Sequence, residues 1–158
     1  MGAAITIRDF DPQRDWAEFV ALNYRTFRDS VPADEPVNEA AFKQHHAWLV
    51  AHFAPNDPRK AKVFVAEVSG AYAGHVWVGN QTDFFTKRQD PWIFDLSVKP
   101  TCRRKGVALA LHGKVEQWAR QQGLTLLGLQ VMAHNEAAQK LYEHLGYKAR
   151  AISLKKTL

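Results

Sequence analysis

A basic turn between an apolar run and a helix is the part of this chain best suited to chemistry. Residues 93–111 read IFDLSVKPTCRRKGVALAL, in which Arg103, Arg104 and Lys105 precede Gly106. A strand that turns directly into a helix directs backbone N–H groups and the positive end of the helix dipole at one point, and this arrangement binds phosphate. Solvated charges at the start of an ordinary helix would give the same string. The turn alone therefore suggests, without proving, a phosphate-bearing ligand.

A second block of residues narrows the choice of ligand. The phosphate loop GxxxxGK[ST] and the dinucleotide fingerprint GxGxxG do not occur in the sequence. The basic turn instead follows Val98-Lys99-Pro100, and NEAAQKLYEHLGY stands downstream at residues 135–147. These blocks match, in order and spacing, a signature that joins V-x-P and Q/R-x-x-G-x-G/A to N-x-x-A-x-x-L-Y-x-x-x-G-F/Y. The chain therefore resembles the GNAT superfamily of acetyl-CoA-dependent N-acetyltransferases, with matching motifs over residues 92–147.

The resemblance implies acetyl-CoA (coenzyme A) as the cofactor. Its pantetheine arm is expected along a bulged strand, whose open backbone can pair with amides like an added strand. Its pyrophosphate is expected on the basic turn, where Ala108 replaces a commoner glycine within the family pattern. Asn135 also suits a helix N-cap, and the two roles are compatible. The residues expected to bind the cofactor are Leu96, Ser97, Val98, Arg103, Arg104, Lys105, Gly106, Val107, Ala108, Leu109 and Asn135.

Tyr142 is the residue that the resemblance assigns to proton transfer. A phenol with a pKa of about 10 can protonate a departing thiolate when it lies near the sulfur. A core tyrosine is the alternative, because Ala138, Leu141 and Leu145 share its helical stripe. The backbone N–H of Val98 is expected to stabilise the negative charge that develops on the thioester oxygen.

The general base is left open by the sequence. An attacking ammonium must lose a proton, and relatives resembling ribosomal-protein alanine acetyltransferases use a glutamate five residues before the asparagine. Gln130 occupies that position and cannot accept a proton, which weakens assignment to that branch. Asp95, an acid on the predicted bulged strand, is the candidate base, since partial burial can tune a carboxylate toward neutral pH. A purely structural aspartate and a water relay without a dedicated base are the alternatives.

Hydrophobic periodicity and turn residues predict the elements that position these groups. Strands are expected at residues 4–8, 62–69, 72–79, 92–98, 124–131 and 147–154, and helices from residue 12, at 39–53, after residue 105 and at 135–145. The predicted fold is a single α/β domain over residues 1–158. The elements follow the order β-α-α-β-β-β-α-β-α-β. The resemblance implies that they form a GNAT-like fold, with a central twisted mixed sheet flanked by helices.

Composition favours a cytoplasmic protein with an anionic ligand, which could be a nucleic acid, a phosphorylated cofactor or an acidic substrate. The net charge is +5, and the lone Cys102 excludes an intrachain disulfide and is expected to be incidental to the chemistry. No apolar run approaches the roughly 20 residues that span a bilayer. Met1-Gly2 begins like an acylation site, but the residues after it favour a strand. The expected partner is an amine, on a small molecule or a protein, with no nucleic acid and no membrane; a homodimer is the working expectation.

Several other residues invite a functional interpretation. His45, His46 and His52 share a predicted helix without the HExxH pattern of a zinc site, so no metal is expected. An acceptor pocket could be lined by Trp77, Trp92, His75, Phe84 and Phe85, and a cationic amine could be attracted by Asp34 and Glu35. Two other classes of function stay open, a noncatalytic acyl-CoA-binding domain and a nucleic-acid binder that uses the basic turn. The identity of the acceptor amine is not readable.

Overall fold

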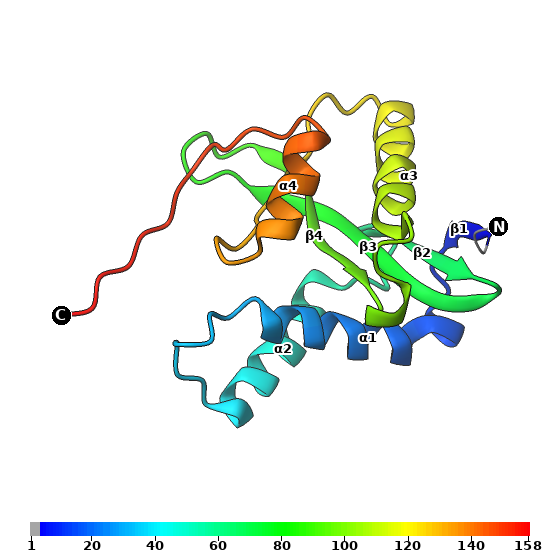
Figure 1. The fold of residues 1–158 in the computed structure, drawn as a ribbon. Helices are drawn as coiled ribbons and strands as arrows, with labels where there is room; N and C mark the ends of the chain where they lie inside the picture. Colours follow the sequence, from blue (N-terminus) through cyan, green and yellow to red (C-terminus); the bar gives the residue numbers. More distant parts are fainter. Residues whose placement is uncertain (1–3) are drawn as a thin grey trace.

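The computed structural model describes residues 4–158, which form a five-stranded mixed sheet between two layers of helices (Figure 1). The strands are β1 (Ile5–Asp9), β2 (Lys62–Val68), β3 (Ala71–Thr82), β4 (Gln89–Val98) and β5 (Gly128–Leu129). The helices are α1 (Pro12–Asp29), α2 (Glu39–Phe53), α3 (Val107–Gln121) and α4 (Glu136–His144), with a 3-10 turn at Pro100–Cys102. The expected α/β class is confirmed, while Met1-Gly2 lies outside the described residues.

The strands follow one another across the sheet in the order β1-β2-β3-β4-β5. The first three pairings are antiparallel, and β4 pairs with β5 in parallel. The β2–β3 hairpin turns at Ser69 and Gly70, which both have positive φ angles, of 53° and 77°. Glycine reaches this conformation without steric cost, which explains why the predicted hairpin forms at this point.

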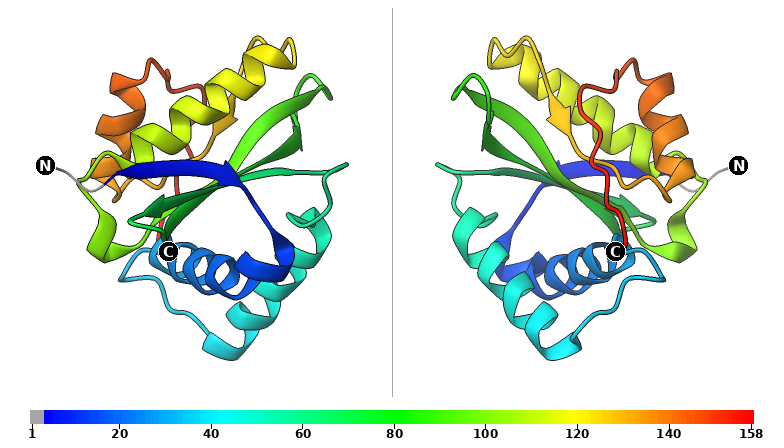
Figure 2. Two further views of the ribbon diagram at one scale, coloured as in Figure 1. Left: turned by 90° about the vertical axis from the view of Figure 1, so that its right-hand side faces the viewer. Right: turned by 90° about the vertical axis from the view of Figure 1, so that its left-hand side faces the viewer.

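Two hydrophobic cores cover the two faces of the sheet. Helices α1 and α2 lie on one face and α3 and α4 on the other (Figures 1 and 2). Under α3 the core contains Phe64, Val76, Val78, Ile93, Val107, Leu111 and Val115. The core under α1 is smaller, with Phe19, Val63 and Trp77. Among the described residues, no helix is long and apolar enough to cross a membrane.

A β-bulge at Phe94 decides which way the end of β4 faces. Trp77 pairs with Asp95 and Val78 pairs with Ile93, so Phe94 is the extra residue. Ile93 faces the α3 core, whereas Phe94 packs against Trp77 on the α1 face. Because two successive residues face the same way, Asp95 also lies on the α1 face. Simple alternation would have buried its carboxylate in the apolar core under α3.

Strands β4 and β5 separate immediately before the bulge. Their pairing ends at Ile93 and Leu129, so one edge of β4 is open from Phe94 onward in the described chain. The N–H of Lys99 donates to the Ala73 oxygen of β3 at 2.8 Å. Successive backbone groups point to opposite edges of a strand, so the N–H groups of Leu96 and Val98 point toward the opening.

The last predicted strand, at residues 147–154, is wrong. Residues 148–158 belong to no helix or strand, and the exposed fractions of Ile152 and Leu154 are 83% and 88%. Because this strand is missing, the element order ends on α4. The strand predicted at 124–131 does form, but it is limited to the two residues of β5. Alternating residue types form a strand only when their backbone finds a ladder partner, which this segment lacks in the described structure.

Candidate functional site

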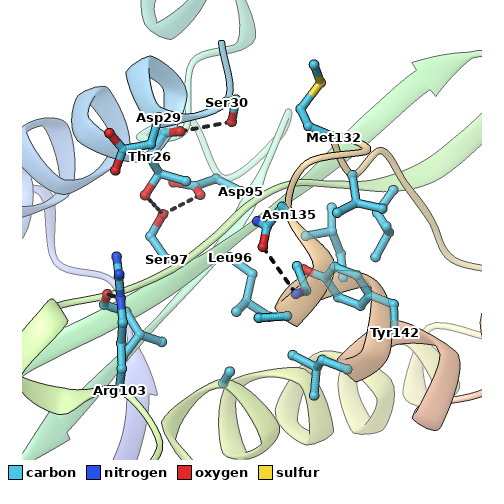
Figure 3. A pocket seen from close by; sticks show the side chains of 18 of the residues that line it. Thr26, Asp29, Ser30, Asp95, Leu96, Ser97, Arg103, Met132, Asn135 and Tyr142 are labelled. Carbon is cyan, nitrogen blue, oxygen red and sulfur yellow. Dashed lines mark hydrogen bonds between the residues drawn. The ribbon is translucent and has the colours of Figure 1, made fainter. Parts of the chain in front are cut away.

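A cavity of about 710 Å³ lies where β4 and β5 separate. Its walls come from the open end of β4, the start of α3, the residues that follow β5, the inner side of α4 and the last turn of α1 (Figure 3). The volume lies within the ordinary range for small-molecule sites. Of the residues predicted to act on or bind the cofactor, all line this cavity except Lys105: Asp95, Leu96, Ser97, Val98, Arg103, Arg104, Gly106, Val107, Ala108, Leu109, Asn135 and Tyr142.

The basic turn presents backbone donors to the cavity. Arg104 and Gly106 have positive φ angles of 60° and 84°, which wrap the chain tightly before α3. The N–H of Ala110 donates to the Gly106 oxygen at 3.0 Å as the first turn of α3 closes. The N–H groups of Val107 to Leu109 precede that bond, so they have no acceptor within the helix. A helix start with unused donors suits a phosphate.

Two basic side chains of the turn bond to the protein's own backbone. Arg103 donates through Nε to the Val98 oxygen at 3.2 Å. Lys105 donates through Nζ to the Thr101 oxygen at 2.9 Å and does not line the cavity. Arg104 lines both this cavity and an adjoining hollow on the side of Lys140.

Helix α4 contributes Asn135 and Tyr142. The Asn135 side chain accepts from the N–H of Ala138 at 3.2 Å, which confirms the N-cap expected from the sequence. Tyr142 lines the cavity and packs edge-on against Tyr147, with ring centroids 5.5 Å apart. Burial, together with the negative charge of Asp95, raises the pKa of Tyr142 to about 12. Its hydroxyl therefore keeps its proton throughout the neutral range.

Asp95 lies under α1 with three hydrogen-bond donors. Its Oδ2 accepts from Asn23 Nδ2 at 2.6 Å and contacts His75 Nε2 at 2.6 Å. Its Oδ1 contacts the Ser97 hydroxyl at 2.5 Å, which in turn lies 2.7 Å from the Thr26 hydroxyl (Figure 3). Asp95 is only 7% exposed, yet it lines the cavity. A buried carboxylate with this many partners can stay charged.

The cavity end near Asp95 is formed by residues that the sequence did not single out. The last turn of α1 supplies Thr26, Asp29 and Ser30, and His134 donates through Nε2 to the Asp29 oxygen at 3.0 Å. Polar residues at helical spacing beside the apolar Phe19 and its neighbours were the available signal. That pattern is also typical of an ordinary helix boundary, so its meaning appears only once α1 packs against β4.

The aromatic residues suggested for an acceptor pocket do not line the cavity. Phe84 and Phe85 are 78% and 81% exposed at the β3–β4 hairpin. Trp77 is buried under α1, and the ring of Trp92 lies over Gly128, where an added Cβ would come within 2.3 Å of it. Glu35 pairs with Lys155 at 3.1 Å instead of facing the cavity.

The remaining reactive side chains form no metal site. Cys102 lines the cavity wall and is half-buried. On α2, His45 and His52 stack on the exposed Trp48, while His46 points inward to Asn23. Across residues 4–158, no group of three or more histidine, cysteine, aspartate or glutamate side chains is arranged to hold a metal ion.

Known proteins share this architecture. A putative acetyl transferase from Pyrococcus furiosus superposes with a TM-score of 0.79 at 28% identity, over 98% of this chain and 100% of that one. The mycothiol acetyltransferase of Thermomonospora curvata is 26% identical over 95% of this chain and 46% of its own length. The uncharacterized N-acetyltransferase YycN of Bacillus subtilis is 32% identical over 54% of this chain and 53% of its own. The chain thus spans about half the length of the curated relatives it matches.

The family model for GNAT acetyltransferases matches residues 16–147, which include most of α1, the bulged strand, the basic turn and the whole α4 motif block. This span contains every residue placed above on the walls of the cavity. With most of the chain matched in this way, the protein belongs to the acetyltransferase (GNAT) family.

Proposed function

We propose that this protein is an N-acetyltransferase that moves the acetyl group of acetyl-CoA to a primary amine. One observation carries the proposal: a single cavity joins the basic turn, the open edge of β4, Tyr142 and Asp95. Family membership and the acetyltransferases among its relatives support the same reaction class. The acceptor is a small-molecule or protein amine.

The residues around the cavity fit the parts of acetyl-CoA. The unused N–H groups at the start of α3, beside Arg104, suit a pyrophosphate. The outward N–H groups of Leu96 and Val98 suit an amide-containing arm that pairs as an added strand. The N–H of Ser97 faces β3 and not the opening, so it does not suit the arm. The Ser97 hydroxyl instead contacts Asp95 and Thr26. When bound, acetyl-CoA supplies an activated thioester.

The chain's own groups then have separate tasks in the transfer. The Val98 N–H donates to the thioester oxygen as negative charge develops there. Asp95 accepts the proton that the ammonium must lose, directly or through a water molecule. With acetyl-CoA bound, the amine nitrogen would bond to the acetyl carbon and the carbon–sulfur bond would break, and Tyr142 would give its hydroxyl proton to the leaving sulfur. The second proton that the nitrogen loses on becoming an amide would restore the Tyr142 hydroxyl. The raised pKa of Tyr142 keeps that proton available at neutral pH.

The test compares Tyr142→Phe with Tyr147→Phe in a thiol-release assay with acetyl-CoA and a panel of amines. Tyr142→Phe is expected to lower kcat by about 10²–10⁴-fold, the usual contribution of a general acid, while acetyl-CoA binds within twofold of the parent. Tyr147→Phe removes the neighbouring hydroxyl, which bonds His112 at 2.8 Å and does not line the cavity. It is expected to change kcat less than threefold.

Three outcomes would oppose all or part of the proposal. Full activity of Tyr142→Phe would remove this residue from proton transfer. Acetyl-CoA binding by the parent protein without thiol release for any amine would support a noncatalytic acyl-CoA-binding domain instead. Salt-sensitive binding to DNA or RNA that acetyl-CoA does not displace would support the nucleic-acid alternative.

A further inference from the structure

A buried hydrogen-bonded chain runs from Tyr72 on β3 to the carboxylate at the cavity. The Tyr72 hydroxyl lies 2.6 Å from His75 Nδ1, and His75 Nε2 lies 2.6 Å from Asp95 Oδ2. His75 has no exposed surface at all. Its ring packs against Phe19 of α1, with centroids 4.4 Å apart, so it reaches solvent only through its two polar neighbours. The transfer reaction proposed above assigns no task to either Tyr72 or His75.

The partners of the imidazole determine where its proton lies. Burial, reinforced by nearby carboxylates, raises the pKa of Tyr72 well above its usual range, so its hydroxyl stays protonated. When that hydroxyl donates to Nδ1, the nitrogen carries no proton. Nε2 carries the proton and donates to Asp95, whose ionised oxygens only accept. The chain therefore has one direction, from the phenol through the neutral imidazole to the carboxylate.

The Asn23 side chain, the second donor to Asp95, is also oriented by a histidine. Asn23 Oδ1 lies 2.7 Å from His46 Nε2 on α2, which leaves the Asn23 amide N–H₂ to face Asp95. Burial lowers the pKa of His46, so this ring is also neutral and donates through Nε2. Helices α1 and α2 thus hold one side of the carboxylate while β3 holds the other.

We propose that Tyr72 and His75 are positioning residues for Asp95: the Tyr72 hydroxyl holds His75 as the Nε2–H tautomer, and that N–H keeps the carboxylate ionised and turned toward the amine. This inference rests on the proposed acetyl transfer for its kinetic consequence. The geometry resembles the way a third residue orients the base in other hydrogen-bonded catalytic groups. In this scheme the proton lost by the ammonium goes to Asp95 and not to the His75 ring.

Other charges near the chain are paired with one another. Lys99 lies 5.5 Å from the ring centroid of Tyr72 and bonds Glu18 of α1 at 2.8 Å. Arg8 of β1 pairs with Asp15 of α1 at 2.7 Å. The titratable and charged groups that face Tyr72, His75 and Asp95 from the packed elements are Arg8, Asp15, Glu18, His46, Lys99 and Tyr142. None of these is in hydrogen-bond contact with the His75 ring, so Asp95 is its one charged partner in the described structure.

The first experiment needs no acceptor and no catalysis. Nitrogen-15 NMR of the histidine rings in the intact protein, from pH 5.5 to 8.5, is expected to show His75 with a protonated Nε2 and a bare Nδ1 throughout. Tyr72→Phe removes the donor to Nδ1, and the ring is expected to show both tautomers or to titrate. A parent His75 that is an imidazolium, or that carries its proton on Nδ1, overturns the proposal.

The second experiment measures the acidic limb of kcat/KM against pH. His75→Phe removes one donor from Asp95, which disfavours the charged carboxylate, so the limb is expected to move upward by about one pH unit. His75→Gln keeps an N–H group that can donate to Asp95. In this variant the acidic limb is expected to lie close to its position in the parent protein. His112→Gln is the matched control, because His112 is a second buried histidine bonded to a tyrosine hydroxyl, at 2.8 Å, without a carboxylate at the cavity. Its limb is expected to stay in place.

The outcomes separate this inference from the proposed function. If His75→Phe and His75→Gln lower the rate equally at every pH and leave the limb in place, the histidine only supports the fold. If no amine is acetylated, the proposed function fails, whereas the tautomer is still decided by NMR. Melting temperatures of all variants show which of them remain folded.

Discussion

The two ends of the cavity differ in the groups that form them, which are mainly backbone groups at one end and side chains at the other. At the α3 end, backbone N–H groups and the left-handed Gly106 shape the site, and the side chain of Lys105 turns away to its own backbone. At the Asp95 end, side chains from α1, α2, β3 and β4 form one connected hydrogen-bonded group. The first end depends on local chain geometry, and the second depends on tertiary packing.

This difference teaches where each end is vulnerable. A site formed by backbone N–H groups tolerates many different side chains, but it tolerates few substitutions at residues with a positive φ angle. A buried polar group tolerates almost no loss of a partner, because each unpaired donor or acceptor costs about 1–3 kcal/mol. Substitutions at the α3 end should therefore act on cofactor affinity, and substitutions at the Asp95 end on catalytic rate and stability.

The largest effect is expected for Asp95→Asn. The amide removes the negative charge and directs an N–H₂ group toward donors already supplied by Asn23, His75 and Ser97. We expect kcat/KM to fall by about 10²–10³-fold and the free energy of unfolding to fall by about 1–3 kcal/mol. Acetyl-CoA affinity should stay within twofold by calorimetry. A loss of affinity as large as the loss of rate would erase the distinction between the two ends.

An intermediate effect is expected for Gly106→Ala. The positive φ of 84° costs a non-glycine residue about 1–2 kcal/mol, although an added Cβ would meet only Ile5 Cδ1, at 3.9 Å. If the turn relaxes, acetyl-CoA should bind about tenfold more weakly with little change in kcat. Gly123→Ala is the matched control, since Gly123 has a φ of 71° after the far end of α3 and open space around it. It should lose similar stability and no affinity, and equal losses of affinity would refute the local cradle.

The smallest effect is expected from the basic side chains themselves. Arg104 lines the cavity, whereas the Lys105 ammonium bonds the Thr101 oxygen. Exposed charge pairs contribute about 0.2–1 kcal/mol, so Arg104→Ala should weaken acetyl-CoA binding about two- to fivefold. Lys105→Ala should weaken it less than twofold. Titrations at low and high salt would sharpen the comparison, because only the contribution of Arg104 should shrink with salt. The reverse order would place Lys105, and not Arg104, on the phosphates.

The same contrast explains what the sequence predicted. The basic turn and the α4 block are each a continuous stretch of sequence, and the chemistry of each follows from its local geometry. Their residues could therefore be recognised from the sequence, and most of those predicted to act lie on one cavity. Asp95 was recognised as an acid on a bulged strand, but its partners Asn23 and His75 stand far away in the chain and meet it only through packing. Pairing partners are equally invisible in a single segment, which is why residues 147–154 were wrongly predicted as a strand.

The extra residue at Phe94 makes the backbone path of β4 as important as its composition. If β4 kept Phe94 but ran without the bulge, plain alternation would exchange the two faces of every position after it. Asp95 and Ser97 would then point into the apolar layer under α3, and Leu96 and Val98 into the polar group under α1. A chain without the bulge would have to exchange residue types at four consecutive positions to keep the same site. The bulge itself is therefore as much a part of the site as the side chains that it orients, and Asp95 could keep its face without the bulge only if Phe94 were absent as well.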